Sequence, residues 1–137
     1  MTEEPADENT NLQEFLQQEL VQDTTTIVRE ETKRAKELFR FDEDGNVHLT
    51  KGSEYGLKDR ILVYLIAKQY ATHAGLTEEP TASTSEMADA LDSESKTISA
   101  RLSEMKNNQV SSVSRGEYKI SGQAIPDVLD YLLEAEK

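Results

Sequence analysis

Apolar residues recur with helical spacing along the first third of the chain. Between Leu12 and Leu38 they follow one another at intervals of three, four and seven residues. Because a helix turns once in about 3.6 residues, this spacing gathers them into one stripe. The pattern predicts an amphipathic helix over about residues 11–39. Three consecutive threonines at 24–26 carry β-branched side chains, which lower helix propensity and allow a break there.

A polar turn between two short apolar runs follows this helix. Residues 38–41 and 47–49 are mostly apolar, and Asp44-Gly45 lies between them. Asp-Gly flanked by apolar segments is typical of a tight β-hairpin. We therefore predict two short strands joined by this turn.

The same turn has oxygen-bearing side chains in the order of a calcium-binding loop. Asp42, Asp44 and Asn46 occupy its first, third and fifth positions. The glycine that such a loop requires at its sixth position is replaced by Val47, and the glutamate at its twelfth by Ser53. We favour a solvated turn over a calcium site.

The most apolar segment lies in the middle of the chain, after an expected linker at residues 50–56. A helix is predicted over Leu57–Ala74, with Gly75 ending it in the left-handed conformation that suits glycine. Its centre, Ile61–Ala67, is apolar on every side and must therefore be buried all round. The domain that follows can cover only one side. The N-terminal helix and a second subunit are both candidates to cover the other.

Short helices and strands alternate over the rest of the chain. Ser83 or Thr84 can cap the first of these helices, and Pro126 can begin the last, where its missing amide is not needed. The predicted elements are a loop over 76–83 that ends in a short strand, helices Ser85–Leu91 and Glu94–Asn107, strands Val110–Ser114 and Glu117–Ser121, and a helix Asp127–Glu134.

The apolar residues of these elements divide into a core face and a solvent face. They lie about one turn apart in the two short helices and alternate in the strands. The predicted core residues are Met87, Ala88, Leu91, Ile98, Leu102, Met105, Val110, Val113, Tyr118 and Ile120.

The order of helices and strands is that of a winged helix-turn-helix. The sequence therefore predicts a mainly α fold with a small β wing (α+β), preceded by the N-terminal amphipathic helix. Residues 1–9 are acidic and are expected to form a disordered tail. Residues 10–50, the helix and the hairpin, are expected to serve oligomerisation. Residues 51–137 are the predicted winged helix-turn-helix domain with its C-terminal helix.

Three segments within residues 57–121 resemble the winged helix-turn-helix of archaeal transcription regulators. They are Thr84–Leu91, Lys96–Met105 and Arg115–Ile120. The resemblance covers about half of the chain, and the acidic flanks resemble those of proteins from halophilic archaea. It implies a DNA-binding transcriptional regulator in which the outward face of the second helix enters the major groove.

The net charge of −12 would disfavour DNA binding if it were spread evenly along the chain. Residues 1–50 carry 13 acidic and 5 basic side chains, whereas residues 84–121 carry 6 acidic and 5 basic ones. The acidity is therefore concentrated outside the predicted helix-turn-helix. A nearly neutral segment can present a local basic face, so the charge distribution is compatible with DNA binding.

A helical wheel identifies the side of the second helix that would face DNA. With about 100° between successive residues, Lys96, Ala100 and Ser103 lie opposite the predicted core face. Arg101 lies at the edge of that face and can extend outward. Lys and Arg can bind phosphate or guanine, and small side chains permit close approach. The candidate DNA-binding residues are Ser95, Lys96, Thr97, Ser99, Ala100, Arg101, Ser103, Arg115 and Lys119.

A nearly neutral face binds DNA weakly as a single copy, so we expect a homodimer that contacts two half-sites of double-stranded DNA. The alternative is a winged-helix protein–protein interaction module that does not bind DNA. An enzyme is disfavoured, because the chain has no cysteine, no Gly-rich phosphate loop and no nucleophile–base pair. Neither a cofactor nor a metal is expected.

The localisation expected from the sequence is cytoplasmic. The apolar runs are much shorter than the roughly 18 residues of a membrane span. The acidic N-terminus has no apolar stretch of the kind that a signal peptide requires. We therefore expect no contact with a membrane.

Overall fold

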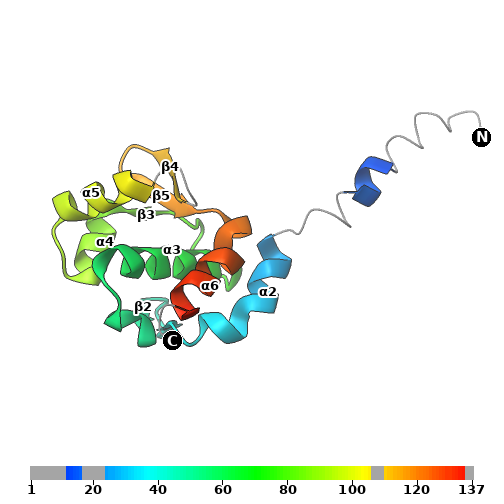
Figure 1. Ribbon diagram of the computed structural model, residues 1–137, viewed down its shortest axis with the longest axis horizontal. Helices are drawn as coiled ribbons and strands as arrows, with labels where there is room; N and C mark the ends of the chain where they lie inside the picture. The colour runs from blue at the N-terminus through cyan, green and yellow to red at the C-terminus, as the bar shows by residue number, and fades with distance from the viewer. Residues whose placement is uncertain (1–11, 17–23, 106–109, 135–137) are drawn as a thin grey trace, which may run out of the picture.

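The computed structural model describes residues 12–16, 24–105 and 110–134 (Figure 1). The expected acidic tail at residues 1–9 lies outside these ranges, and residues 12–16 are helical. The other helices are α2 (Thr24–Ala35), η1 (Lys51–Glu54, 3-10), α3 (Leu57–His73), α4 (Thr84–Leu91), α5 (Ser95–Met105), η2 (Gly122–Ala124, 3-10) and α6 (Ile125–Glu134). The strands are β1 (Phe39–Phe41), β2 (Val47–Leu49), β3 (Ala82–Ser83), β4 (Val110–Ser114) and β5 (Glu117–Ile120).

The strands form two small antiparallel sheets. β1 pairs with β2, so that Phe39 lies opposite Leu49, and the predicted hairpin is confirmed. In the second sheet β5 lies between β3 and β4. Helices make up most of the described secondary structure. The prediction of a mainly α protein with a small β component (α+β) is confirmed at this level.

Helix α3 runs through the middle of the molecule, with α4 and α5 towards one end and α2 and α6 towards the other (Figure 1). The β1–β2 hairpin also packs against it. Every residue from Ile61 to Ala67 is buried, as the sequence predicted. The side of α3 that needed a second cover therefore finds it in α2, α6 and the hairpin of the same chain.

One hydrophobic core joins the early and late parts of the described chain. Ile27 of α2 and Leu38 of the following turn belong to the same cluster as Leu102 of α5 and Leu129 of α6. Residues 24–50 therefore share one core with the α4–α5 pair, and they pack directly against α3, η2 and α6. Among the described helices, none has the length and apolar composition to cross a membrane.

Gly75 ends α3 as predicted, with a positive φ of 78°. Its amide donates to the carbonyl of Thr72 at 3.1 Å, and the amide of Leu76 donates to the carbonyl of Ala71 at 2.8 Å. This pair of bonds is the Schellman arrangement, which satisfies the last carbonyl groups of a helix.

The helix predicted over 11–39 ends earlier than the sequence pattern indicated. α2 stops at Ala35, where the amide of Leu38 donates to the carbonyl of Ala35 at 2.9 Å in a tight turn. Phe39 then enters β1, and its ring contacts that of Tyr70 on α3. Leu38 and Phe39 are both buried. Apolar residues at these two positions fit the apolar stripe of a helix as well as a short strand, so their spacing did not distinguish the two. The course of residues 17–23 lies outside the described ranges.

The expected linker at 50–56 is also more ordered than its polar composition suggested. It contains the 3-10 helix η1, and the hydroxyl of Tyr55 donates to the carbonyl of Leu132 at 2.8 Å. This bond connects the segment to α6, so the prediction of a plain linker at residues 50–56 was wrong.

The core residues predicted for α4, α5, β4 and β5 are buried, with one exception in β4. Val113 is 49% exposed, so its assignment to the core was wrong. The β4–β5 register shifts between Ser112 and Ser114, which makes Val113 the extra residue of a bulge. The confirmed core residues are Met87, Ala88, Leu91, Ile98, Leu102, Met105, Val110 and Ile120, and Tyr118 is half-buried against them.

Candidate nucleic-acid interface

Local hydrogen bonds define both ends of α4, and the second end leads into the turn to α5. Ser83 caps α4, because its hydroxyl accepts a bond from the amide of Glu86 at 3.0 Å. At the other end Asp92 adopts a left-handed conformation with φ of 54°, and the amide of Ser93 donates to the carbonyl of Ala88 at 2.9 Å. The predicted cap and turn are both confirmed.

Helix α5 presents a face of small side chains to solvent. Ile98, Leu102 and Met105 are buried, which orients the opposite side of the helix outward. The candidate residues Ser95, Lys96, Ser99, Ala100 and Ser103 are exposed, and Thr97 is half-buried beside them.

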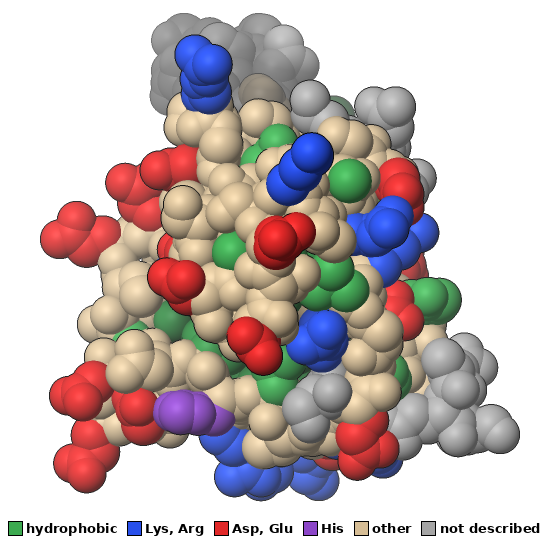
Figure 2. All heavy atoms as spheres, turned by 90° about the vertical axis from the view of Figure 1, so that its left-hand side faces the viewer, with side chains coloured by type: hydrophobic (Ala, Val, Ile, Leu, Met, Phe, Trp, Pro, Cys, Tyr) green, Lys and Arg blue, Asp and Glu red, His purple; other side chains and the backbone are tan. Residues whose placement is uncertain are grey.

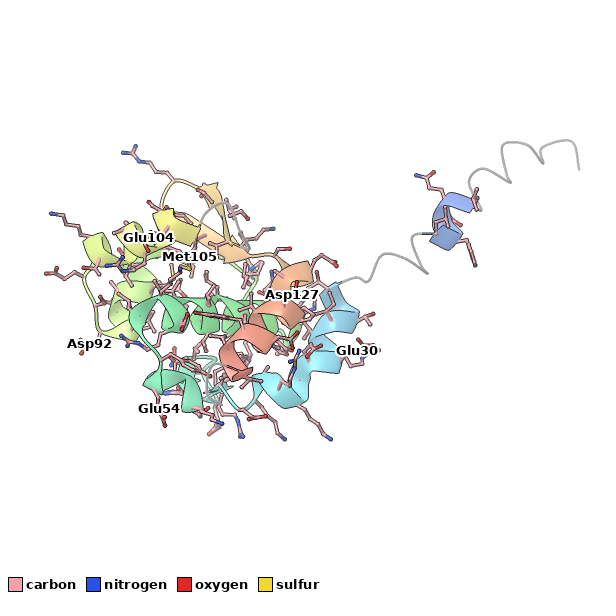
Figure 3. The ribbon with its side chains drawn as sticks, in the orientation of Figure 1. Glu30, Glu54, Asp92, Glu104, Met105 and Asp127 are labelled. Carbon is pink, nitrogen blue, oxygen red and sulfur yellow. The ribbon has the colours of Figure 1, made fainter. Side chains whose placement is uncertain are left out.

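Arg101 lies on the flank of α5 and pairs with an acid of the same helix. Its Nη1 donates to Oε2 of Glu104 at 2.6 Å, three residues further along. Glu104 lies near the end of α5, beside the buried Met105 (Figure 3). The one arginine on the candidate face is therefore held by a carboxylate.

The wing contributes two further candidate residues. Arg115 is exposed at the tip, next to Gly116, whose positive φ of 77° permits the tight turn between β4 and β5. Lys119 lies between the inward-facing Tyr118 and Ile120, so strand alternation directs it to the outer face of the sheet. It is half-buried and pairs across the ladder with Ser111.

Basic and acidic side chains are mixed on this end of the molecule. Figure 2 looks onto the end formed by α4 and α5 and shows Lys and Arg interspersed with Asp and Glu. Asp89, Glu94 and Glu104 are all exposed on these two helices or the turn between them. The charge balance therefore limits the number of phosphates that this surface can neutralise.

The acids of α2 and α6 lie elsewhere. Figure 3 places Glu30 on α2 and Asp127 on α6. Both lie at the end of the molecule opposite Asp92, which belongs to the α4–α5 turn. The separation that the sequence suggested between the acidic flanks and α5 holds for these two residues.

Three polar side chains of α3 form hydrogen bonds to α4 and β5. Gln69 is only 6% exposed, and its Nε2 donates to the carbonyl of Ile120 at 2.8 Å, at the end of β5. Arg60 donates from Nη1 to the carbonyl of Leu91 at 3.2 Å, at the end of α4. Neither residue is among those that the sequence pattern predicted for the site. The signal for Gln69 in the sequence was a glutamine near the end of an otherwise apolar run.

Tyr64 is the third of these side chains. Its hydroxyl donates to Oε2 of Glu86 at 2.7 Å, and the same oxygen accepts from Nζ of Lys68 at 2.9 Å. Burial, followed by the neighbouring Glu86 carboxylate, raises the pKa of Tyr64 well above its usual value. The cluster connects α3 to the first turn of α4.

The side-chain oxygens of Asp42 in the hairpin turn accept hydrogen bonds from residues of the hairpin itself. Oδ1 of Asp42 accepts from the amides of Asp44 and Asn46, each at 2.9 Å, and Oδ2 lies 3.0 Å from Nε2 of His48. The bond from His48, and then that from the Asn46 amide, holds the pKa of Asp42 well below its usual range. Among the described residues, no group of three His, Asp or Glu side chains is placed to hold a metal ion.

Comparisons of the chain with protein families, with curated proteins and with solved structures each find no match.

Proposed function

We propose that this protein binds double-stranded DNA through a winged helix-turn-helix and acts as a transcriptional regulator. The order α3, β3, α4, α5, β4, β5, with a three-stranded antiparallel sheet, supports the winged-helix assignment. The observation that carries the proposal is the exposed face of α5, where Lys96 stands beside small side chains that include Ala100 and Ser103. A helix with such a face can approach base edges closely.

In the proposed complex α5 lies in the major groove and the wing lies over the adjacent backbone. Lys96 and Arg115 contact phosphates, which gives affinity without sequence preference. Lys119 contributes a further phosphate contact from the outer face of the sheet. Arg101 is the candidate for a guanine contact, because guanine offers two acceptors in the major groove. Ser95, Thr97 and Ser99 supply hydroxyl groups to phosphate or base edges.

The proposal includes a homodimer. A face with few net positive charges binds one half-site weakly, and two copies double the phosphate contacts. α3 is covered within the chain, so the surface that would join two copies must lie elsewhere. Leu12, Phe15 and Leu16 lie three and four residues apart on a helical segment, and each is exposed. We assign the dimer contact to this stripe and propose a cytoplasmic location.

The test is a titration of duplex DNA at several salt concentrations. Lys96→Ala and Arg115→Ala should each weaken binding to all sequences alike. Each should also reduce the slope of log K against log salt concentration by about 0.9, the value for one lost phosphate contact. Arg29→Ala and Lys33→Ala remove the same charge from exposed positions of α2 and serve as matched controls. Equal losses in all four variants would show that only the net charge matters.

The mixed charges on the α4–α5 end favour one alternative, a protein–protein interaction module. Glu104 and Asp89 repel phosphate, whereas a protein partner can pair with both signs of charge. If the unaltered protein binds no duplex at low salt, and Lys96→Ala weakens binding to a protein partner, this alternative replaces the DNA proposal.

A further inference from the structure

The ion pair between Arg101 and Glu104 changes where the arginine head group lies. On a helical wheel with about 100° per residue, Arg101 projects about 110° away from the outward direction of α5, and Glu104 only about 50° away. The outward direction is taken opposite the buried Ile98, Leu102 and Met105. The two side chains meet at 2.6 Å, so the ion pair lies between these two directions, on the outward side of the Arg101 position.

The pair leaves the arginine free to make further contacts. Glu104 accepts from Nη1, and no described residue accepts a hydrogen bond from Nη2 or Nε. Both side chains are accessible, at 40% for Arg101 and 51% for Glu104. A guanidinium held at one nitrogen retains N–H donors along its other edges, and two such donors match the O6 and N7 acceptors of guanine.

We propose that Glu104 is a positioning residue, which orients Arg101 to recognise a guanine in the major groove. This inference rests on the proposed DNA binding and names the base that α5 selects. Glu104 has two opposite effects on DNA. Its carboxylate repels phosphate and so weakens binding to every sequence, whereas its bond to Arg101 strengthens binding to sites with a guanine in register. The ratio between the two kinds of site is therefore larger than Arg101 alone would produce.

The experiment measures base preference rather than affinity alone. The full-length protein is used to select from a library of randomised duplex DNA, and chosen duplexes are then titrated individually. The unaltered protein should prefer guanine at one position by about 5- to 150-fold, the discrimination of a good bidentate contact. Arg101→Ala should lose this preference. Glu104→Ala should lose most of it while binding unrelated duplexes as tightly as before or more tightly.

A double-variant comparison separates orientation from simple charge removal. If Glu104 acts through Arg101, Glu104→Ala should lower the guanine preference only when Arg101 is present, and in the Arg101→Ala background it should only tighten binding to all duplexes alike. Glu104→Gln retains a neutral acceptor and should keep part of the preference. Glu94→Gln, at an exposed position at the start of α5, makes the same change of charge and should keep all of it. Thermal unfolding of each variant checks that the helix is intact.

The outcomes distinguish this inference from the proposed function. If Glu104→Ala tightens binding to all duplexes alike and leaves the guanine preference unchanged, the positioning role is wrong and DNA binding stands. If the unaltered protein binds duplexes without any base preference, the guanine contact itself is wrong. If it binds no duplex at low salt, both the proposed function and this inference fail.

Discussion

The two buried tyrosines of α3 are held in their neutral form by their surroundings. Burial, and then the nearby Glu31 carboxylate, raises the pKa of Tyr70 to about 12. Tyr64 is shifted in the same direction by burial and Glu86. Both hydroxyls therefore remain protonated in the folded protein at pH values where they ionise in the unfolded chain.

This difference predicts how stability depends on alkaline pH. For Tyr70 the unfolded pKa is 10.0 and the folded one is about 12. A raised pKa contributes stability that is fully present below the unfolded value and is lost as pH rises through the folded one. The free energy of unfolding of the unaltered protein should therefore fall relative to Tyr70→Phe between about pH 10 and pH 12. Denaturant unfolding across this range measures it, and parallel pH profiles for the two proteins would contradict the burial of this phenol.

At the scale of elements, α2 contacts the C-terminal part of the chain in two ways. Its polar side chains pair with α6, and its first residue packs closely against η2. Arg34 pairs with Asp130 of α6 and with Glu31 of its own helix, and its Nη2 donates to the carbonyl of Pro126 at 3.3 Å. The hydrogen bond that Arg34 donates to Asp130 is the main cause that raises the pKa of Arg34. These contacts hold α2 on the side of α3 that faces away from α4.

The close approach lies between Gly122 of η2 and the start of α2. A Cβ atom at Gly122 would lie 2.3 Å from Oγ1, 2.5 Å from Cγ2 and 2.9 Å from Cβ of Thr24. Gly122→Ala should therefore displace α2 and lower the free energy of unfolding by about 1–3 kcal/mol, as overpacking of a close contact does. Chemical denaturation of the purified variant measures the loss.

A compensating variant tests the cause of that loss. Thr24→Gly removes all three atoms that the new Cβ would meet, so it should recover part of the stability when combined with Gly122→Ala. Thr24→Ala retains a Cβ and should recover less. If both combinations are as unstable as Gly122→Ala alone, the contact with α2 is not what makes glycine necessary.

At the scale of the whole molecule, the core leaves little apolar surface uncovered in the described residues. The exposed large apolar residues are Leu12, Phe15, Leu16, Leu76, Val113 and Tyr131. Three of the six cluster on the helical residues 12–16, whereas the others are scattered over the α3–β3 loop, the wing and α6. A cluster at helical spacing is the pattern of a partner-binding face, whereas single exposed apolar residues are ordinary.

The proposed homodimer can be tested on the full-length chain. Replacing Leu12, Phe15 and Leu16 together by Ser should weaken self-association by about 100-fold or more, since central apolar contacts are each worth more than about 1 kcal/mol. Helix α3 should stay buried, because its cover comes from the same chain. Sedimentation over a range of concentrations measures the change, and Val113→Ser is the matched control. A dimer unaffected by the triple replacement would move the contact to another surface.

The sequence by itself determined the features that depend on neighbours along the chain. The phase of α5 follows from the spacing of Ile98, Leu102 and Met105, and it predicts the exposure of Lys96 and Ser103. The hairpin and the helix caps could be predicted for the same reason, because turn and cap residues act on the backbone next to them. Most of the candidate interface could therefore be located in advance, although its role in binding stays a prediction.

Only the tertiary structure decided which surfaces meet. Spacing showed that α3 is apolar on every side, but α2, α6 and the hairpin cover it through contacts between residues far apart in the chain. Gln69 and Ile120 also meet only through the packing of elements far apart in the chain. Cross-strand pairing within each hairpin decided that Phe39 belongs to a strand and that the bulge exposes Val113. A periodic pattern shows which side of a helix or strand is buried. Which element covers that side depends on how all the elements pack together into one core.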